Sequence, residues 1–448
     1  MTTSSATRDC DVAIVGAGVA GLAAMRDLEE CGLRTTVIEA RNRIGGRIHT
    51  VRDERLSHAI ELGAEFIHGS APALVEIVNE ARLAPFVIEG ERWRRHGGRL
   101  THLPDFWKQM RQVTARTNPK GPDRSFDEFL ADRPGGPSAA DARAFVRSFV
   151  ENYQGADASK VSARAMIQDG IPSEDSGETR MMRIPGGYDL VPEWLARGYS
   201  EAIMKETVVE EISWEKGSVS LSVRWRRAAP MAITARAAVV TVPLGVLLAP
   251  EGEEGTIRFS PPLEPLGNLG ERLAMGPVVR AVILFRERWW EKRLRSVPKG
   301  ASLDTLSFLM GDTGDMRVWW SLHPAHLPVL VGWVGGPQAE RLAELPEDEI
   351  RERAISSVAA NFGVQRGRVA SQVEGWWMHN WVHDPYARGA YSYPLVGGAK
   401  AAASLARPVE GTIWLAGEAA DAGGRNGTVH GAIDSGRHAA KEIARALT

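Results

Sequence analysis

Short apolar runs alternate with amphipathic stretches near the start of this chain. Residues 11–15 read Asp-Val-Ala-Ile-Val, a run rich in β-branched residues that is typical of a buried parallel strand, and residues 35–38 repeat the pattern. Between them, residues 22–30 predict a helix that ends at Gly32. Strand, helix and strand in this order predict an α/β fold that opens with a βαβ unit.

Later apolar runs predict a second sheet with helices. Three such runs have the length and composition of strands: residues 277–285, 317–322 and 328–334. Residues 347–361 predict a helix that follows them. The region over residues 85–182 shows polar helical patterns, at residues 106–111 and 142–153, with a Pro/Gly-rich break at residues 133–137. The chain therefore combines a first α/β layer with a mixed second domain.

A glycine motif follows the first predicted strand. Gly16, Gly18 and Gly21 form a GxGxxG sequence that ends in the predicted helix, and Glu39 follows the second strand. The first glycine permits a tight turn, the second lets backbone approach a pyrophosphate, and the third lets the helix pack against the strand. Glu39 stands where a carboxylate binds ribose hydroxyls. These features together predict a Rossmann-like, dinucleotide-binding unit.

The composition excludes several other classes of function. Among 448 residues, 54 are Lys or Arg and 56 are Asp or Glu, which argues against a nucleic-acid or anionic-membrane binder. No apolar run is long enough to span a bilayer, and the start of the chain has no apolar signal segment, so we expect a cytoplasmic protein. The two cysteines, Cys10 and Cys31, exclude a disulfide framework or cysteine-rich metal site. The histidines have no ligand-like spacing, so we expect no metal.

A second glycine pair distinguishes this nucleotide site from a simple NAD site. This pair, Gly45 and Gly46, provides another close approach of the backbone to a diphosphate. The guanidinium groups that flank it, on Arg41, Arg43 and Arg47, can pair with the diphosphate charge. This segment resembles the RxGGR sequence of the flavin-containing amine oxidase superfamily. The resemblance implies FAD as the cofactor.

Further segments resemble this family in the order that it requires. Residues 61–70 end in Ile-His-Gly-Ser, which is similar to the spermine and polyamine oxidase branch, and residues 183–188, 238–247 and 380–393 resemble later family segments. The resemblance implies the following further cofactor-binding residues: Gly63, Ala64, Glu65, Phe66, Val209, Trp381, Glu418, Thr428 and Val429. The motifs extend from residue 11 to residue 438, so the resemblance covers nearly the whole chain.

The positions of these motifs predict a discontinuous cofactor domain. Residues 1–84, 183–255 and 401–448 are expected to form the FAD-binding domain, and residues 85–182 and 256–400 the substrate-binding domain. No long insertion interrupts the motifs, in contrast to the histone demethylases of the superfamily, so we expect a small-molecule substrate. The sequence leaves the oligomeric state open.

The resemblance implies oxidation of a carbon–nitrogen bond. A primary or secondary amine, polyamine-like in the nearest branch, would transfer a hydride to flavin N5, the imine would hydrolyse, and O₂ would reoxidise the flavin to give H₂O₂. Ala390 stands in place of the cysteine that tethers FAD in monoamine oxidases, so we expect non-covalent FAD. Arg280 stands in place of the lysine that most members set opposite N5 through a water. Arginine keeps its proton and is planar, which suggests an altered oxygen reaction or a site for a substrate carboxylate.

Three more residues are predicted to meet the substrate. Tyr391 is expected to form one wall of an aromatic cage around the amine, with Thr428 in place of the opposite aromatic wall. His68 could bind the substrate nitrogen, and Glu65 could bind a second cationic amine. The acidic run over residues 173–178 is interpreted as a solvated loop rather than an opening for polycations.

Several alternatives remain open at this point. An L-amino-acid oxidase would use Arg280 to bind the substrate carboxylate, and a carbon–carbon desaturase of the same superfamily is a more distant possibility. A flavoprotein that has lost turnover would explain the missing lysine in a different way. The leading hypothesis is an FAD-dependent amine oxidase with catalytic contributions from Arg280, His68, Tyr391 and Thr428.

Overall fold

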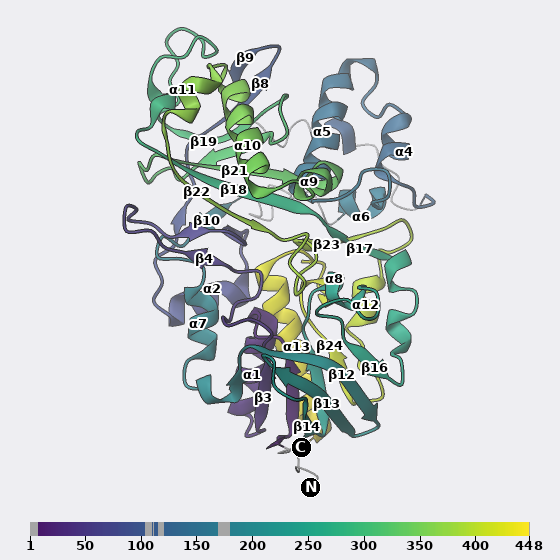
Figure 1. The fold of residues 1–448 in the computed structure, drawn as a ribbon. Helices are drawn as coiled ribbons and strands as arrows, with labels where there is room; N and C mark the ends of the chain where they lie inside the picture. The colour runs from purple at the N-terminus through teal and green to yellow at the C-terminus, as the bar shows by residue number, and fades with distance from the viewer. Residues whose placement is uncertain (1–7, 104–109, 111, 115–120, 169–179, 448) are drawn as a thin grey trace.

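A parallel sheet stands at the base of the molecule, beside both chain ends (Figure 1). The computed structural model describes residues 8–103, 110, 112–114, 121–168 and 180–447. The sheet has the order β11-β3-β2-β15-β24, with all neighbours parallel. Its strands are β11 (Ile203–Met204), β3 (Thr35–Ile38), β2 (Val12–Val15), β15 (Ala237–Val240) and β24 (Ile413–Leu415).

Four helices from separate parts of the chain cover one face of this sheet. The helices are α1 (Val19–Glu30), α2 (Pro72–Glu80), α7 (Leu190–Ala196) and α13 (Val429–Leu447). The first and last of these lie side by side, because Gly436 has no side chain: an added Cβ would stand 2.1 Å from the backbone oxygen of Ala20. Helix and sheet residues share one buried core. The predicted βαβ unit is confirmed.

A second sheet packs on the other face. It has the order β1-β14-β13-β12-β16, with strands β1 (Arg8–Asp9), β14 (Met231–Ala235), β13 (Ser218–Trp225), β12 (Thr207–Glu215) and β16 (Arg258–Ser260). Val209 and Ile212 of β12 alternate with more exposed neighbours and join the core between the two sheets. Around the nucleotide region lie α8 (Leu244–Leu247), α12 (Ala401–Leu405), and the strand pairs β4 (Thr50–Val51) with β5 (Ile60–Glu61) and β17 (Leu273–Gly276) with β23 (Tyr391–Pro394).

A seven-stranded sheet occupies the opposite half of the molecule (Figure 1). Its order is β22 (Val373–Asn380), β18 (Val278–Phe285), β21 (Val329–Gly335), β20 (Val318–Ser321), β19 (Leu306–Met310), β8 (Glu91–His96) and β9 (Arg99–His102). Helices α9 (Gly336–Ala343), α10 (Glu347–Phe362) and α11 (Arg366–Ala370) lie beside it. The three predicted strands and the helix over residues 347–361 are confirmed.

Helices α4 (Phe126–Ala131), α5 (Ala140–Tyr153) and α6 (Ala163–Gln168) form a separate group with its own core. Helix α4 begins with a capping box, in which Ser125 and Glu128 bind each other's backbone N–H groups. The predicted helix over residues 142–153 is confirmed as part of α5. Residues 106–109 and 111, which were expected to be helical, and the acidic run at residues 173–178 lie outside the described residues.

Within residues 85–182, helical patterns were predicted at residues 106–111 and 142–153, but the strands at the start of this region were not predicted. This region begins with β7 (Phe86–Val87), β8 and β9. Strand β7 joins β6 (Ile67–His68) and β10 (Met181–Arg183) in a three-stranded sheet, whereas β8 pairs with β19 and β9 extends the seven-stranded sheet. Strand β8 was missed because it reads Glu-Arg-Trp-Arg-Arg-His, with Trp93 as its single buried residue.

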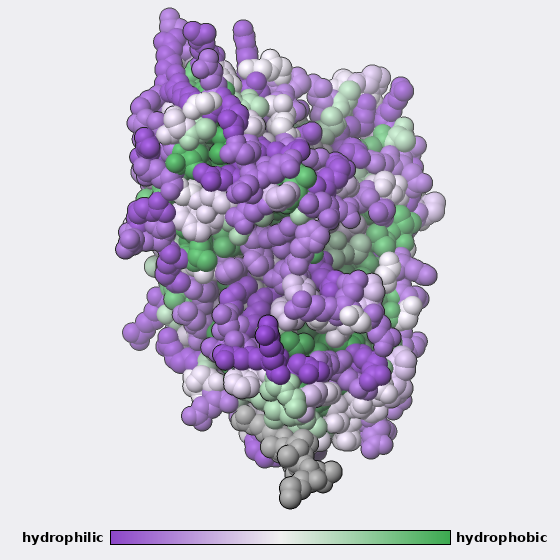
Figure 2. Space-filling view, in the orientation of Figure 1, coloured by the Kyte–Doolittle hydropathy of each residue, from purple (hydrophilic) through white to green (hydrophobic). Residues whose placement is uncertain are grey.

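The face of the molecule that Figure 2 shows is predominantly polar. Hydrophobic residues lie on it in small scattered patches. Among the described residues, no helix has the length and apolar character required to cross a membrane. The predicted α/β class is confirmed, and the predicted mixed sheet with helices corresponds to the seven-stranded sheet.

Candidate active site

A single cavity of about 740 Å³ connects the first βαβ unit with the seven-stranded sheet and α5. Gly16, Gly18 and Glu39 line it at one end. Phe308 and Trp320 of the seven-stranded sheet, with aromatic residues of α5, line it at the other. We call these the nucleotide end and the substrate end.

The glycine motif is built as its spacing predicts. Gly16 has a φ of +102°, and a Cβ on it would stand 2.8 Å from Thr241 Oγ1. A Cβ on Gly21 would stand 2.0 Å from the carbonyl oxygen of Gly16, so only glycine lets α1 approach the strand. Around Gly18 an added Cβ would meet nothing within 4 Å. The chain thus leaves open space at the N-terminus of α1, where no side chain caps the free N–H groups.

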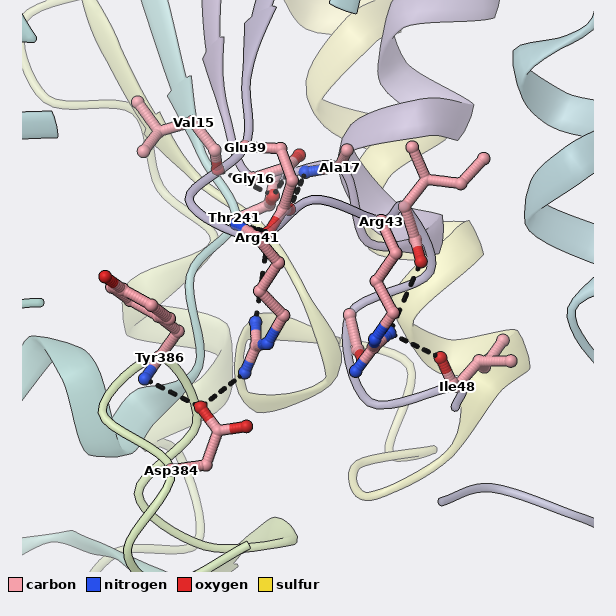
Figure 3. Close-up of polar contacts among 12 residues, drawn as sticks. Val15, Gly16, Ala17, Glu39, Arg41, Arg43, Ile48, Thr241, Asp384 and Tyr386 are labelled. Carbon is pink, nitrogen blue, oxygen red and sulfur yellow. Dashed lines mark hydrogen bonds and ion pairs between the residues drawn. The ribbon is translucent and has the colours of Figure 1, made fainter. Parts of the chain in front are cut away.

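Glu39 is buried and directed into the same turn. Its side-chain oxygens accept hydrogen bonds from Ala17 N at 2.8 Å and Arg41 N at 2.9 Å, as Figure 3 shows. Burial raises the pKa of Glu39, opposed by the Arg41 and Ala17 hydrogen bonds and the charge of Arg41. A buried carboxylate that lines the cavity at this position fits the hydroxyls of a ribose.

The second glycine pair lies against the first motif. Gly45 and Gly46 have φ values of +96° and +58°, and Gly45 forms a parallel bridge with Gly18. A Cβ on Gly46 would stand 3.4 Å from Gly18 Cα. Both glycines line the cavity, so two glycine turns face the same open space.

The arginines around this pair are already engaged with the protein. Arg41 donates to Asp384 at 2.6 Å, and Arg43 donates to the carbonyls of Gly46 and Ile48 (Figure 3). Burial opposes a low pKa for Asp384, but hydrogen bonds from His379 and Arg41 hold its pKa well below the usual range. Arg41 lines the cavity, whereas Arg43 fixes the loop instead of lining it. This placement separates the two guanidinium groups that the sequence had grouped together.

Glu418 joins three distant parts of the chain. It accepts hydrogen bonds from Arg47 at 2.7 Å, from Ser392 Oγ at 2.7 Å and from Gly427 N at 2.9 Å. Arg47 also donates to the carbonyl oxygen of Ala390 at 2.8 Å. Glu418 therefore aligns the walls of the cavity between its two ends.

Val209 and Val429 line the cavity from β12 and from the start of α13. Strand β12 has a bulge between Val209 and Glu211, which interrupts the regular pairing with β13 at this point. Thr428 lines the cavity as well, but its Oγ1 donates to Arg425 O at 2.6 Å and accepts from Gly431 N at 3.0 Å. Thr428 thus caps α13, a role that the sequence analysis did not assign.

The segment around Gly63 depends on close backbone contact. A Cβ on Gly63 would stand 1.9 Å from the carbonyl oxygen of Arg47 and 3.1 Å from the Trp381 ring. Trp381 is buried and donates to the Leu62 carbonyl at 2.8 Å, while Ala64 N donates to Arg47 O at 3.2 Å. These contacts hold the segment that leads to Glu65 and Phe66.

Glu65 lies buried between two arginines. Arg183 Nε donates to it at 2.6 Å, Arg280 forms an ion pair with it, and Trp320 Nε1 donates to it at 3.2 Å. Burial would raise the pKa of Glu65, but the charges of Arg183 and Arg280 hold it below the usual value. Glu65 is therefore already neutralised, which leaves it poorly placed to bind a second cationic amine.

Arg280 has two of its three nitrogens engaged. It donates through Nη1 to the Gly63 carbonyl at 2.8 Å and through Nη2 to Glu65, while its buried Nε has no hydrogen-bond partner in the described part of the chain. The guanidinium also lies over the Trp320 ring at 5.3 Å. A bidentate pair with a substrate carboxylate would have to displace these contacts.

Tyr391 and His68 meet the same residue of α5. Tyr391 donates through its hydroxyl to the Tyr153 carbonyl, and the Tyr153 hydroxyl shares a hydrogen bond with His68 Nδ1 at 3.3 Å. Burial lowers the pKa of His68 to about 4, so the ring is neutral at neutral pH. Gly427 lies against Tyr391, with its Cβ position 3.6 Å from the Tyr391 Cβ. Tyr153 was missed because the sequence predicted only its helix.

A stripe of aromatic residues on α5 completes the substrate end. Phe145, Phe149 and Tyr153 recur every fourth residue and line the cavity, with the last two rings stacked at 4.6 Å. Phe66 also lines the cavity, and its ring centre lies 6.0 Å from that of Phe308 and 5.6 Å from that of Trp320. The four-residue spacing of the stripe is a signal that could have been found in the sequence.

The comparisons with known proteins agree with this geometry. The sequence matches the family of flavin containing amine oxidoreductases over residues 19–444. The chain belongs to this family. It is thus an oxidoreductase that acts on amine donors, and the family resemblance stated from the sequence is confirmed.

Relatives of this amine oxidoreductase have several substrates in their names. Human lysine-specific histone demethylase 2 is 26% identical over 97% of this chain and 53% of its own length, so the chain spans about half of that relative. Putrescine oxidase bound to putrescine has a TM-score of 0.78 at 21% identity, and cyclohexylamine oxidase from Brevibacterium oxydans IH-35A has 0.78 at 22%. Each alignment covers 98% of this chain and 99% of the other. At this identity the two structures show a shared fold.

Proposed function

We propose that this amine oxidoreductase is an FAD-dependent oxidase that cleaves the carbon–nitrogen bond of a primary or secondary amine. The continuous cavity carries the proposal: glycine turns and a buried carboxylate form one end, and an aromatic chamber forms the other. When bound, the flavin would accept the hydride from the carbon that bears nitrogen and pass the electrons to O₂, giving H₂O₂. The imine product then hydrolyses to a carbonyl compound and an amine.

The residues fit FAD at the nucleotide end. Open space at Gly18, the free N–H groups of α1 and the buried Glu39 match a pyrophosphate and a ribose. Through the contacts described above, the cofactor would also be supported by six further residues: Gly63, Ala64, Glu65, Phe66, Trp381 and Glu418. Ala390 carries only a methyl group and offers no nucleophile for a covalent tether, which supports non-covalent FAD.

The residues of the substrate end would orient the amine. Tyr391 would direct it toward the flavin, and the neutral His68 would accept a hydrogen bond from it without repelling a cation. Arg280, held by Gly63 and Glu65, would stabilise charge through its free Nε rather than act as a base. The division into an FAD-binding and a substrate-binding domain at the predicted boundaries is part of this proposal.

The amino-acid alternative is less well supported by the site. It requires Arg280 to bind a carboxylate beside the reacting carbon, and both terminal nitrogens of that residue already have acceptors. An Arg280→Lys variant separates the two cases. A faster oxidase reaction would indicate a weakened amine oxidase, whereas a selective loss of acid binding would support the amino-acid reaction.

Anaerobic bleaching of the flavin absorbance tests the proposed function. The purified, flavin-loaded protein would be mixed without O₂ with separate pools of polyamines, arylalkylamines and L-amino acids. Bleaching by an amine pool supports the proposal, and admission of O₂ should then restore the absorbance with release of H₂O₂. If no pool bleaches the flavin, the proposed function is wrong.

A further inference from the structure

Two arginines of β8 face the substrate end of the cavity. Arg92 and Arg94 are two residues apart, so they lie on the same side of the strand, and both line the cavity. Their partners on β19 are Phe308 and Met310, which also line it. The face of the seven-stranded sheet that lines the cavity is therefore apolar over β19, and it carries two cationic side chains on the neighbouring strand β8.

Neither arginine has a carboxylate partner among the residues that the structure describes. Arg94 lies 5.3 Å from the centre of the Phe145 ring, and Arg92 is partly buried. Burial lowers the pKa of Arg92, and no anion among the described residues opposes this shift. In contrast, Arg95 on the other side of β8 lies 3.5 Å from Asp312 and donates to the Asn361 carbonyl at 3.2 Å.

Acidic groups are scarce at this end of the cavity. In the described part of its lining, Glu65 is paired with two arginines and Asp312 is 40% exposed beside Arg95. A diamine or polyamine needs an anion for its distant ammonium group, and the wall offers guanidinium groups there instead. The walls that the described residues form are thus unfavourable to a dication.

Helix α5 gives the separation between the two polar ends. Tyr153 meets Tyr391 and His68, whereas Phe145, eight residues earlier, meets Arg94. Eight residues of α-helix correspond to about 12 Å. Between the two ends the wall is aromatic, through Phe149 on the helix and Phe308 on the sheet.

This inference rests on the proposed amine oxidation and specifies its substrate. We propose that the substrate is a monoamine with a long apolar or aromatic body and a carboxylate at the far end, which Arg92 and Arg94 bind. The amine lies at Tyr391 and His68, and the apolar body lies between α5 and the sheet face. Arginine binds a carboxylate through paired, charge-assisted hydrogen bonds, which compensate for its removal from water.

Three probes of one chain length test the far end alone. ω-Aminooctanoate, octylamine and diaminooctane each carry the same reacting amine and end in a carboxylate, a methyl group or an ammonium group. The rate of anaerobic bleaching, measured at increasing concentrations of each probe, saturates, and its half-saturation point gives the dissociation constant of that probe on the flavin-loaded protein. We expect ω-aminooctanoate to bind about tenfold or more tightly than octylamine, and diaminooctane to bind most weakly.

Matched variants assign the preference to these side chains. The preference is measured as the dissociation constant of octylamine divided by that of ω-aminooctanoate. We expect this ratio to fall by about tenfold in Arg92→Gln, in Arg94→Gln and in the double variant. The Arg94→Glu variant should instead favour diaminooctane. Arg99→Gln is the control, because Arg99 is exposed on the next strand and does not line the cavity, so it should keep the wild-type ratio.

The outcomes separate this inference from the proposed function. If octylamine bleaches the flavin as readily as ω-aminooctanoate, or if the Arg92 and Arg94 variants keep the wild-type ratio, the carboxylate site is wrong while amine oxidation stands. If diaminooctane is preferred, the substrate is a diamine and the inference is overturned. If none of the probes or amine pools bleaches the flavin, the proposed function itself fails.

Discussion

At the nucleotide end of the cavity, the walls are mainly backbone. Gly16, Gly18, Gly45 and Gly46 bring peptide groups to the open space, and Glu39 is the buried carboxylate among them. At the substrate end, side chains from α5, β8, β19 and β20 form the walls. The glycine turns are fixed by backbone contacts, as where Gly21 meets Gly16, whereas a wall of side chains can change by substitution without a change of fold.

The largest expected effect is a loss of bound flavin on substitution of Gly21, whose backbone packs directly against the backbone of Gly16. In Gly21→Ala the new Cβ would stand 2.0 Å from the carbonyl oxygen of Gly16, and neither group can move without shifting α1. We expect the purified variant to retain less than about a tenth of the wild-type flavin, because overpacking of this kind distorts the backbone. Flavin absorbance per protein measures this.

Gly367→Ala is the matched control for Gly21→Ala. Gly367 lies in α11, and its added Cβ would meet nothing within 4 Å. It should retain wild-type flavin. Normal flavin content in Gly21→Ala would contradict the description of the nucleotide end as a backbone wall.

The next largest effect is at the junction of the two ends, where Glu65 neutralises Arg183 and Arg280. Glu65→Gln would leave two buried guanidinium groups without a counter-charge, which we expect to lower the free energy of unfolding by about 3–5 kcal/mol. Denaturant unfolding of the purified protein measures this loss.

Glu210→Gln tests whether burial causes that loss. The pair of Glu210 with Arg224 has side chains 38% and 40% exposed, so its loss should cost much less stability than the loss of Glu65. Equal losses in the two variants would show that the buried triad contributes no more than a surface ion pair.

A smaller effect is expected at Gly18, where the cavity is open. Gly18→Ala places a methyl group in space that the protein leaves free, so the flavin-free protein should keep the wild-type Tm. Flavin should bind more weakly by about 1–3 kcal/mol, the range for overpacking at a fitted contact. Titration with FAD measures the affinity. A lower Tm of the flavin-free variant would mean that the space is not reserved for a cofactor.

The effect that is smallest at neutral pH concerns the histidines of the substrate end. Burial lowers the pKa of both His68 and His430 to about 4, below the unfolded value near 6.5. The unfolded chain therefore binds more protons between these values, so stability falls as the pH is lowered from about 6.5 to about 4, by at most about 1.4 kcal/mol per pH unit for each ring.

His68→Gln should flatten this pH dependence of Tm. His96→Gln, on an exposed position, serves as the control and should leave the slope unchanged. An unchanged slope in His68→Gln would contradict a neutral, buried ring at this position.

The nucleotide end could be predicted because its residues are close in sequence. Strand, glycine turn, helix and Glu39 follow one another within about one βαβ unit, and each has a distinct backbone requirement. The roles assigned to Arg280, His68 and Tyr391 remain predictions, although the cavity contains all three.

The substrate end could not be predicted because its contacts are distant in sequence. Glu65 meets Arg183 and Arg280, which are 118 and 215 residues away. Strand β8 presents arginines to the cavity and so lacks the apolar alternation by which a strand is found. The departure from the expected pattern marks the part of the strand that lines the cavity.

The crystal structure of the flavin-loaded protein with octylamine, prepared without O₂, tests the central claim most directly. We predict one continuous dinucleotide from Glu39 past Gly18 to Arg280, with the amine beside Tyr391 and His68 and its chain between Phe149 and Phe308. Flavin in another place, or an amine bound outside the aromatic chamber, would contradict the account.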